Sequence, residues 1–195
     1  MFKDTRMIDW QFILPSATIF IIFVLSDLFS AIDKIDFAYY SGMYWKEPYR
    51  IITAHFMHAD FSHLLANIFG IVISRYFLNL LGLRDNYLFL ILIITIMPLQ
   101  SSMQWFIDYQ IMRNPYSLGY GFSGVIYGVQ SFILLSSLYG KDNFLCLNIK
   151  LQRNYRVRTT ITLMIALGLT FSLLPGISLI GHSTGLIAGA ILFMF

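Results

Sequence analysis

Residues 120–139 read YGFSGVIYGVQSFILLSSLY, a stretch of 20 residues without one charged side chain. An α-helix needs about 20 mainly apolar residues to cross the hydrocarbon core of a bilayer, so this stretch predicts a membrane-spanning helix. The whole chain has the same character, because 57% of its 195 residues are hydrophobic and 12% are charged. Soluble domains carry roughly 25% charged residues. The composition therefore excludes an ordinary soluble globule, a disordered chain and a disulfide scaffold, and it predicts an all-α, multi-pass integral membrane protein.

Five further apolar runs flank this stretch, and together they predict six spans. In chain order, the predicted spans cover Trp10–Ser26, Phe61–Leu81, Tyr87–Ser101, Tyr120–Tyr139, Thr160–Leu174 and Leu179–Phe195. The segment Asp27–Ala54 is both charged and aromatic, which predicts a long loop in the membrane interface, where Tyr and Trp prefer to lie. Met103–Leu118 is mixed and contains a turn signal at Asn114-Pro115. No internal repeat or linker divides the chain, so we interpret residues 1–195 as a single domain.

The distribution of basic residues predicts the orientation of the spans. Five cations gather between the fourth and fifth spans, namely Lys141, Lys150, Arg153, Arg156 and Arg158. With six spans, this connection lies on the same side as the N-terminus, which carries Lys3 and Arg6. The positive-inside rule makes this side cytoplasmic. We therefore expect a protein of the cell membrane (plasma or inner), in contact with the lipid bilayer, with its N-terminus inside.

Charge and cysteine content exclude two other kinds of partner. The cations are scattered or confined to one loop, and they do not form the interleaved basic and aromatic surface that binds nucleic acid. We therefore expect no nucleic-acid partner. Cys146 is the one cysteine of the chain, which leaves neither an internal disulfide nor a thiolate metal cluster.

Few polar or ionisable side chains fall inside the predicted spans, and such residues are costly enough there to indicate function. All four histidines lie in two places: His55, His58 and His63 around the start of the second span, and His182 at the start of the sixth. Asn67 follows His63 by four residues, so the two side chains share one helical face.

A metal site formed by His55, His58 and Asp60 is one alternative. The zinc-protease pattern requires His-Glu followed two residues later by His, and the chain lacks it. Zinc also requires three or four converging ligands. Histidines at a loop edge near water are tolerated without any such role. We therefore expect no metal, and no residue pattern indicates a cofactor.

Ser123 begins the fourth span between Gly121 and Gly124. A serine at a helix start is more often a cap than a nucleophile. Here the flanking glycines leave the hydroxyl unobstructed, which favours the second role. The context is Gly-x-Ser-Gly, with Val125 next, and therefore differs from the Gly-x-Ser-x-Gly elbow of the α/β-hydrolases.

Pairs of glycines four residues apart line one face of the fourth and of the sixth span. These pairs are Gly124 with Gly128, and Gly185 with Gly189. Such pairs allow the backbones of two helices to approach closely, although many of them serve packing alone. His182 shares the glycine face of the sixth span, so packing of the two faces brings Ser123 and His182 together. A contact of about 2.6–3.2 Å between them suits activation of the hydroxyl by a general base.

Three motifs, in this order along the chain, resemble those of the rhomboid family of intramembrane serine proteases. The matching residues are His58, His63 and Asn67 in the second span, Gly121, Ser123, Gly124 and Tyr127 in the fourth, and His182, Gly185 and Gly189 in the sixth. The long first loop of the family ends with a Trp-Arg pair, and here that pair is Tyr49-Arg50. The resemblance covers nearly the whole chain and implies a six-helix bundle with a water-filled cavity open to the outer face.

The resemblance also implies a reaction and roles. The substrates would be transmembrane segments of other membrane proteins, which must unwind before cleavage and would enter past a mobile fifth span. Ser123 would be the nucleophile and His182 the general base, a dyad without an acidic third member. His63 and Asn67 would donate hydrogen bonds to the oxyanion. Further supporting roles fall to Tyr127, stacked beside His182, to His58, a structural hydrogen-bonding residue, and to Gly121, Gly124, Gly185 and Gly189, which set the helix spacing.

Two alternatives from other classes stay open. One is a catalytically inactive rhomboid-like protein that binds membrane clients, which the presence of both Ser123 and His182 disfavours. The other is a small polytopic transporter or channel that uses the histidines as a proton relay. It is disfavoured because the spans lack the pairs of acids and cations that such relays usually contain.

Overall fold

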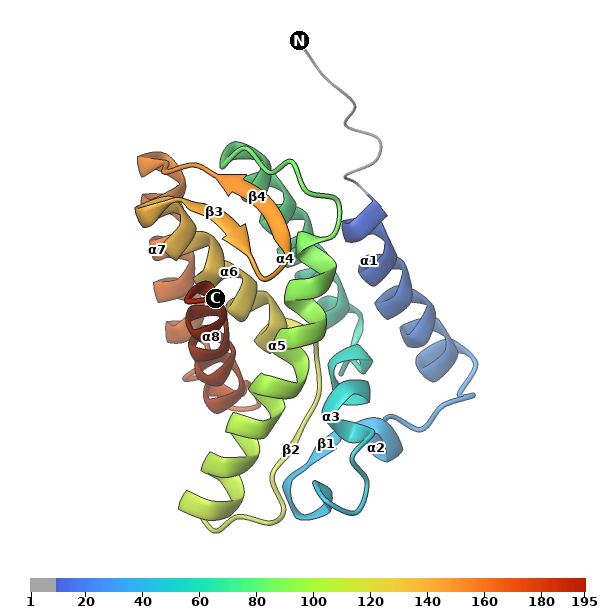
Figure 1. Cartoon of the computed structure of the whole chain (residues 1–195). Helices are drawn as coiled ribbons and strands as arrows, with labels where there is room; N and C mark the ends of the chain where they lie inside the picture. Colours follow the sequence, from blue (N-terminus) through green and yellow to red (C-terminus); the bar gives the residue numbers. More distant parts are fainter. Residues whose placement is uncertain (1–9) are drawn as a thin grey trace.

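Six long helices dominate residues 10–195, the part of the chain that the computed structural model describes (Figure 1). They are α1 (Trp10–Phe23), α4 (Phe61–Leu80), α5 (Leu88–Trp105), α6 (Ser123–Tyr139), α7 (Tyr155–Phe171) and α8 (Leu179–Phe193). Short helices and strands connect them at the two ends of the bundle. Lys3 and Arg6, which contribute to the predicted orientation, lie outside the described residues.

Within residues 10–195, three helices are long and apolar enough to cross a membrane. α1 continues as a π-helix to Leu28 and α5 continues as one to Ile111, giving helices of 19 and 24 residues, and α4 has 20. α6 and α8 are apolar but shorter, and α7 carries Arg156 and Arg158 in its first turn. The helical membrane fold is thus clear, whereas the count of six spans stays a prediction.

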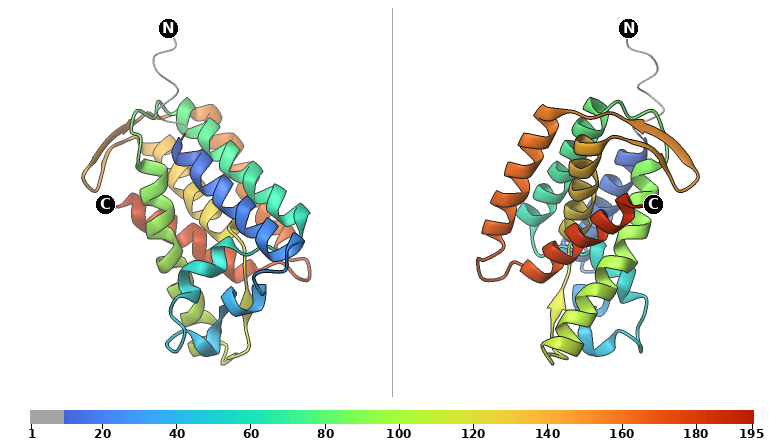
Figure 2. Two further views of the ribbon diagram at one scale, coloured as in Figure 1. Left: turned by 90° about the vertical axis from the view of Figure 1, so that its right-hand side faces the viewer. Right: turned by 60° about the vertical axis from the view of Figure 1, so that its left-hand side comes forward.

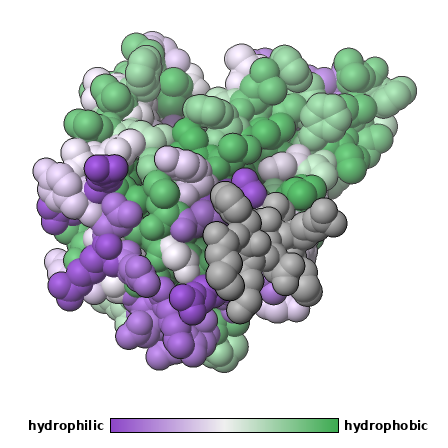
Figure 3. All heavy atoms as spheres, turned by 90° about the horizontal axis from the view of Figure 1, so that it is seen from above, coloured by the Kyte–Doolittle hydropathy of each residue, from purple (hydrophilic) through white to green (hydrophobic). Residues whose placement is uncertain are grey.

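The outer surface of the bundle is rich in large apolar side chains. Exposed examples are Ile13 and Ile21 on α1, Phe69 on α4, and Leu163 and Leu167 on α7. Soluble monomers rarely expose contiguous apolar patches of more than a few hundred Å². From the end of the molecule near the start of α1, hydrophilic side chains cover part of the surface and hydrophobic ones extend beside them (Figure 3). This distribution suits helices that contact lipid along their sides.

The predicted loop Asp27–Ala54 contains several short elements. They are α2 (Lys34–Phe37), β1 (Tyr39–Tyr40), a 3₁₀ turn at Ser41–Met43, α3 (Arg50–Thr53) and a second 3₁₀ turn at Ala54–Phe56. β1 pairs antiparallel with β2 (Leu118–Gly119). Arg50 donates to the carbonyl oxygens of Ile35 and Ala38 and forms an ion pair with Glu47. The arginine of the Tyr49-Arg50 pair therefore connects several parts of this segment. The position of the segment Asp27–Ala54 in the membrane interface stays a prediction.

The helix that contains the predicted third span, Tyr87–Ser101, continues beyond Ser101. α5 and its π-helical continuation run to Ile111. The polar side chains of this extension find partners inside the protein, so the helix does not end where they begin. The Asp108 carboxylate accepts hydrogen bonds from the hydroxyls of Ser117 at 2.8 Å and Tyr39 at 3.2 Å.

The basic connection between the fourth and fifth spans is a β-hairpin, so the fold is not purely α-helical. β3 (Lys141–Phe144) pairs antiparallel with β4 (Leu147–Leu151). Phe144, Ile149 and Leu151 are fully or almost fully buried, and the two-residue spacing of Ile149 and Leu151 is that of a strand with one buried face. Burial of these apolar side chains against the helices explains why the segment is ordered despite its charge.

The helix that contains most of the predicted fifth span, Thr160–Leu174, begins and ends earlier in the chain than that span. α7 begins at Tyr155 because Asn154 caps it, accepting the backbone N–H groups of Arg156 at 3.1 Å and Val157 at 3.2 Å. It ends at Phe171, ahead of Pro175. Only Val157 and Ile161 of its residues are buried, so α7 is loosely packed against the rest of the bundle.

α6 lies inside the bundle, with the other helices around it (Figure 2). Its closest neighbour is α8, and glycines make this approach possible. A Cβ atom added at Gly124 or Gly128 would lie 3.1 Å and 2.9 Å from the carbonyl oxygens of Gly181 and Gly185, respectively. One added at Gly185 would overlap the backbone of Gly124 itself. The glycine faces of the fourth and sixth predicted spans therefore pack against each other.

Candidate active site

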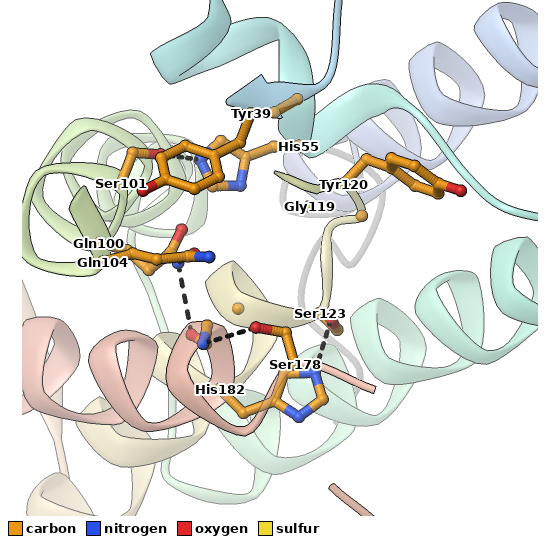
Figure 4. Close-up of a pocket in the computed structure, with 14 residues that line it drawn as sticks. Tyr39, His55, Gln100, Ser101, Gln104, Gly119, Tyr120, Ser123, Ser178 and His182 are labelled. Atoms are coloured by element: carbon orange, nitrogen blue, oxygen red, sulfur yellow. Dashed lines mark hydrogen bonds between the residues drawn. The ribbon is translucent and has the colours of Figure 1, made fainter. Parts of the chain in front are cut away.

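Ser123 is the first residue of α6, which begins in the interior of the molecule after the chain runs inward from β2 (Figure 1). The cap position is Phe122, and it has no side-chain cap hydrogen bond. The hydroxyl of Ser123 contacts the imidazole of His182 instead, with 2.8 Å between Oγ and Nε2 (Figure 4). This distance falls within the range of about 2.6–3.2 Å that suits activation of the hydroxyl by a general base.

His182 lies in the first turn of α8, with only 8% of its surface exposed. Ser178 caps this helix by accepting the N–H of Gly181 at 2.9 Å. The ring of Tyr127 stacks on the imidazole, with 4.4 Å between centroids and 26° between planes. The second ring nitrogen, Nδ1, lies 2.6 Å from the hydroxyl of Ser172, at the end of α7. Contacts with neighbouring helices thus fix both the position and the orientation of the imidazole ring.

His63 and Asn67 lie one turn apart on α4 and approach the start of α6. Nδ1 of His63 accepts the backbone N–H of Ala59 at 3.4 Å, so Nε2 carries the proton. This nitrogen faces Gly121, where an added Cβ would lie 2.7 Å away. Gly121 also has a φ of +126°, which only glycine adopts without strain. Contact with His63 and the positive φ are thus two reasons for this glycine, beside the sequence-based expectation that it leaves Ser123 unobstructed.

Asn67 is 2% exposed, and its side-chain nitrogen Nδ2 has no hydrogen-bond partner within the described residues. A buried amide N–H without a partner is uncommon and costs about 1–3 kcal/mol. Such a group is available to a molecule that binds beside it.

Two cavities meet at Ser123. The larger, of about 710 Å³, is bounded by α4, α6, α7 and the start of α8 and is lined by His63, Asn67, Tyr127 and His182 together with apolar side chains. The smaller, of about 40 Å³, is lined by polar side chains. Figure 4 shows Ser123 and His182 on one side of this smaller pocket, with Tyr39, His55 and Ser101 across from them and Gln100 and Gln104 reaching in from α5.

None of the sequence motifs identified the polar residues of α5. Gln100, Gln104 and Asp108 are spaced by four, which places them on one helical face, and this spacing is a signal that could have identified them. Gln100 Nε2 donates to Gln104 Oε1 at 2.9 Å and to Thr184 Oγ1 at 3.3 Å. Gln104 Nε2 reaches Asp108 at 3.4 Å. Gln100 and Gln104 line the polar pocket beside Ser123, and Gln100 connects α5 to α8.

His58 was expected to be a structural hydrogen-bonding residue of the loop edge. Its Nδ1 donates to the carbonyl oxygen of Phe56 at 3.1 Å, and its ring packs against His63 with 5.1 Å between centroids. Nε2 is buried without a hydrogen-bond partner in the described part of the chain. Burial is the main reason that the pKa of His58 falls to about 4.

The residues of the metal alternative have separate surroundings. His55 shares its Nε2 proton between Ser101 Oγ at 3.0 Å and Met97 O at 3.2 Å, and burial lowers its pKa to about 4. Asp60 caps α4 by accepting the N–H of His63, and a hydrogen bond from Ser62 holds the Asp60 pKa below its usual range. Among residues 10–195, no three His, Cys, Asp or Glu side chains converge in a way that could hold a metal ion.

The arrangement contains the groups that acyl-transfer chemistry requires. A serine hydroxyl is hydrogen-bonded to an imidazole, which can accept its proton. An unpartnered amide nitrogen and an imidazole N–H lie nearby and can stabilise negative charge on an oxygen. A polar pocket adjoins the serine on one side and a large, partly apolar cavity adjoins it on the other.

Comparison with known proteins identifies a family. A family model described as Rhomboid domain matches residues 45–195, from within the segment that follows α1 to the end of the chain. No curated protein matches the chain at a significant level.

Proposed function

The chain belongs to the rhomboid family, and we propose that it is a serine endopeptidase that cuts transmembrane segments of other proteins within the membrane. The observation that carries this proposal is the 2.8 Å hydrogen bond between Ser123 Oγ and His182 Nε2, in a bundle of membrane helices beside a large cavity. Inactive members of the family exist, but both groups of the dyad are present here.

In the proposed reaction, Ser123 Oγ attacks the scissile carbonyl carbon while His182 Nε2 takes the hydroxyl proton. The same nitrogen then protonates the leaving amine, which departs and leaves an acyl-enzyme. A water molecule then gives a proton to Nε2 and attacks the acyl carbon, after which the bond to Ser123 Oγ breaks, Nε2 returns the proton to Oγ, and the peptide leaves with a new carboxyl end. His182 Nε2 is the base in both acylation and deacylation, so the 2.8 Å contact with Ser123 Oγ serves both halves of the cycle.

The proposed oxyanion donors are Asn67 Nδ2, His63 Nε2 and the backbone N–H of Ser123. Asn67 supports this assignment because its buried Nδ2 lacks a partner within residues 10–195. His63 supports it because the hydrogen bond at Nδ1 leaves the proton on Nε2. The Ser123 N–H is free of intrahelical bonding because it belongs to the first turn of α6. Loss of one oxyanion donor typically reduces turnover by about 10²–10³.

The two cavities suggest separate routes for water and substrate. The polar pocket of about 40 Å³ has room for water next to Ser123 and offers the side chains of His55, Gln100 and Gln104 as partners. The cavity of about 710 Å³ can take several residues of an extended peptide. A substrate helix must unwind to fill it, because the helix otherwise shields its own carbonyl groups. Loose packing of α7 favours this side for access from the lipid.

We also propose an orientation for the protein and the membrane in which it lies. α1 begins at the same end of the bundle as the basic β3–β4 hairpin (Figure 1). We assign this end to the cytoplasm by the positive-inside rule, and we count α7 together with the five other long helices as six spans of a cell membrane. The segment with β1, α2 and α3 then lies at the outer boundary of the membrane, on the outer side of Ser123.

The test is cleavage of a transmembrane substrate in proteoliposomes by the wild-type protein and by Ser123→Ala. We expect cleavage, and labelling by a serine-reactive fluorophosphonate, for the wild type and neither for Ser123→Ala. Ser137→Ala is a matched control on the same helix, because the Ser137 hydroxyl only bonds back to Leu134 O at 2.6 Å. Cleavage that survives Ser123→Ala refutes the proposal. A folded wild-type protein that binds substrates without cleaving or being labelled supports the inactive client-binding alternative.

A further inference from the structure

Ser172 connects the end of α7 to the side of His182 that faces away from Ser123. It is the C-cap residue of α7 and is 3% exposed. Its Oγ lies 2.6 Å from His182 Nδ1 and 2.7 Å from the carbonyl oxygen of Gly168. Nothing in the sequence motifs points to this residue, which lies ten positions before His182 on another helix.

The positions of the protons follow from these two contacts. A carbonyl oxygen cannot donate, so the hydrogen bond between Ser172 Oγ and Gly168 O must use the hydroxyl proton of Ser172. The oxygen of Ser172 is then left as an acceptor. The 2.6 Å contact with His182 consequently uses a proton on Nδ1, and the neutral imidazole carries no proton on Nε2. The lone pair of Nε2 therefore faces the hydroxyl of Ser123.

We propose that Ser172 is a positioning residue that holds His182 in the Nδ1–H tautomer, with its basic nitrogen directed at Ser123. The inference rests on the proposed function, because the tautomer matters only if Nε2 acts as a base. When Nε2 gains the serine proton, Nδ1–H stays bonded to the same oxygen. Ser172 thus fills, without charge, the position that a carboxylate holds in a triad.

Tyr127 supports the same geometry from α6. Its ring stacks on His182, and its hydroxyl interacts with Ser172. An added Cβ at Gly168 would overlap this hydroxyl, so the glycine makes room for it. The ionisable groups that face His182 from the neighbouring helices described are Tyr127 on α6 and His63 on α4. Ser172, which has no charge, is the contribution of α7.

The main experiment measures kcat, KM and their pH dependence for Ser172→Ala, with a transmembrane substrate in detergent from pH 5 to 9. We expect a roughly tenfold loss of kcat with little change in KM, the size of effect that one neutral hydrogen bond supports. The acid limb of the profile should move to lower pH, because the imidazolium loses an acceptor. Ser172→Thr keeps the hydroxyl and should restore both properties.

Thr170→Ala is the matched control for the end of α7. The Thr170 hydroxyl makes the same kind of bond to the residue four positions earlier, Ala166 O at 2.9 Å, but on the exposed side of the helix. We expect this variant to keep the wild-type kcat and pH profile. Equal behaviour of Ser172→Ala and Thr170→Ala overturns the inference. So does a loss of kcat in Ser172→Ala with an unmoved acid limb, which indicates a structural role only.

A measurement on the wild-type protein tests the tautomer without any variant. The ¹⁵N chemical shifts of labelled histidine distinguish a protonated Nδ1 from a protonated Nε2, and Ser172→Ala serves to assign the His182 signals if it folds. We expect Nδ1–H for His182 above its titration, and an Nε2–H tautomer overturns the inference. Failure of the proposed function is recognised separately, because wild-type protein then lacks cleavage and fluorophosphonate labelling whatever the tautomer.

Discussion

Replacement of Gly185 by alanine should disable the dyad although residue 185 is not a member of it. Gly185 lies one turn after His182 on α8 and packs against Gly124, which directly follows Ser123 on α6. A Cβ at position 185 would fall well inside the contact distance of the Gly124 carbonyl oxygen, a backbone atom that cannot turn aside. The two helices must therefore separate at the level of the dyad.

The size of the effect follows from the contact distances. Restoring an ordinary contact to the Gly124 oxygen requires a displacement of roughly 1 Å, and a misplacement of that size can reduce catalysis by about 10²-fold. The 2.8 Å hydrogen bond between Ser123 and His182 would then exceed normal hydrogen-bond length. Overpacking of this kind also lowers the free energy of unfolding by about 1–3 kcal/mol. The variant should thus be less stable and much less active.

The assay compares Gly185→Ala with Gly181→Ala, one turn earlier on the same helix. A Cβ at position 181 would meet Ser178 Oγ at 2.9 Å and Gln104 Oε1 at 3.3 Å, and both are side-chain atoms that can move. We expect a loss of cleavage near 10²-fold for Gly185→Ala and a much smaller loss for Gly181→Ala, with thermal unfolding in detergent recorded for both. Equal activities would refute the reasoning that the glycine contact sets the distance between Ser123 and His182.

Three other predictions concern the surroundings of the dyad. Asn67→Ala should reduce kcat by about 10²–10³ with a smaller change in KM, since the proposed donor acts on the oxyanion, and unchanged kcat would contradict this role. Gly168→Ala should reduce cleavage by displacing the Tyr127 hydroxyl, and the double variant with Tyr127→Phe, which removes that hydroxyl, should recover part of the loss. Stability should fall as the pH drops from about 6.5 toward 5, because burial lowers the pKa of His55 and His58 to about 4, and unfolding then takes up protons. Thermal unfolding temperatures in detergent that stay constant over this range would contradict that expectation.

Local patterns in the chain predicted much of the fold. Apolar runs of about 20 residues identify membrane helices, because the thickness of the bilayer requires that length. The observed α4 agrees with the predicted second span to within one residue at Leu81. The glycine spacing in α6 and α8 likewise predicted a close helix pair, since the face of a helix is a local property.

Segments stabilised by distant contacts were predicted less well. The extension of α5 to Ile111 depends on Asp108 receiving hydrogen bonds from Tyr39 and Ser117, which are far away in the sequence or beyond a turn. The β3–β4 hairpin depends on burial of Phe144 among the helices. Neither contact is visible in the hydropathy of the segment itself.

For the site, the sequence alone determined which residues are candidates and on which helical faces they lie. Polar side chains inside apolar spans are energetically costly, so their presence indicates function. This reasoning identified Ser123, His182, His63 and Asn67. Only the tertiary structure brought Ser172 to His182 Nδ1 and the polar face of α5 to the other side of Ser123. These contacts join different helices, and the distance between two helices depends on the packing of every side chain between them rather than on the spacing within either one.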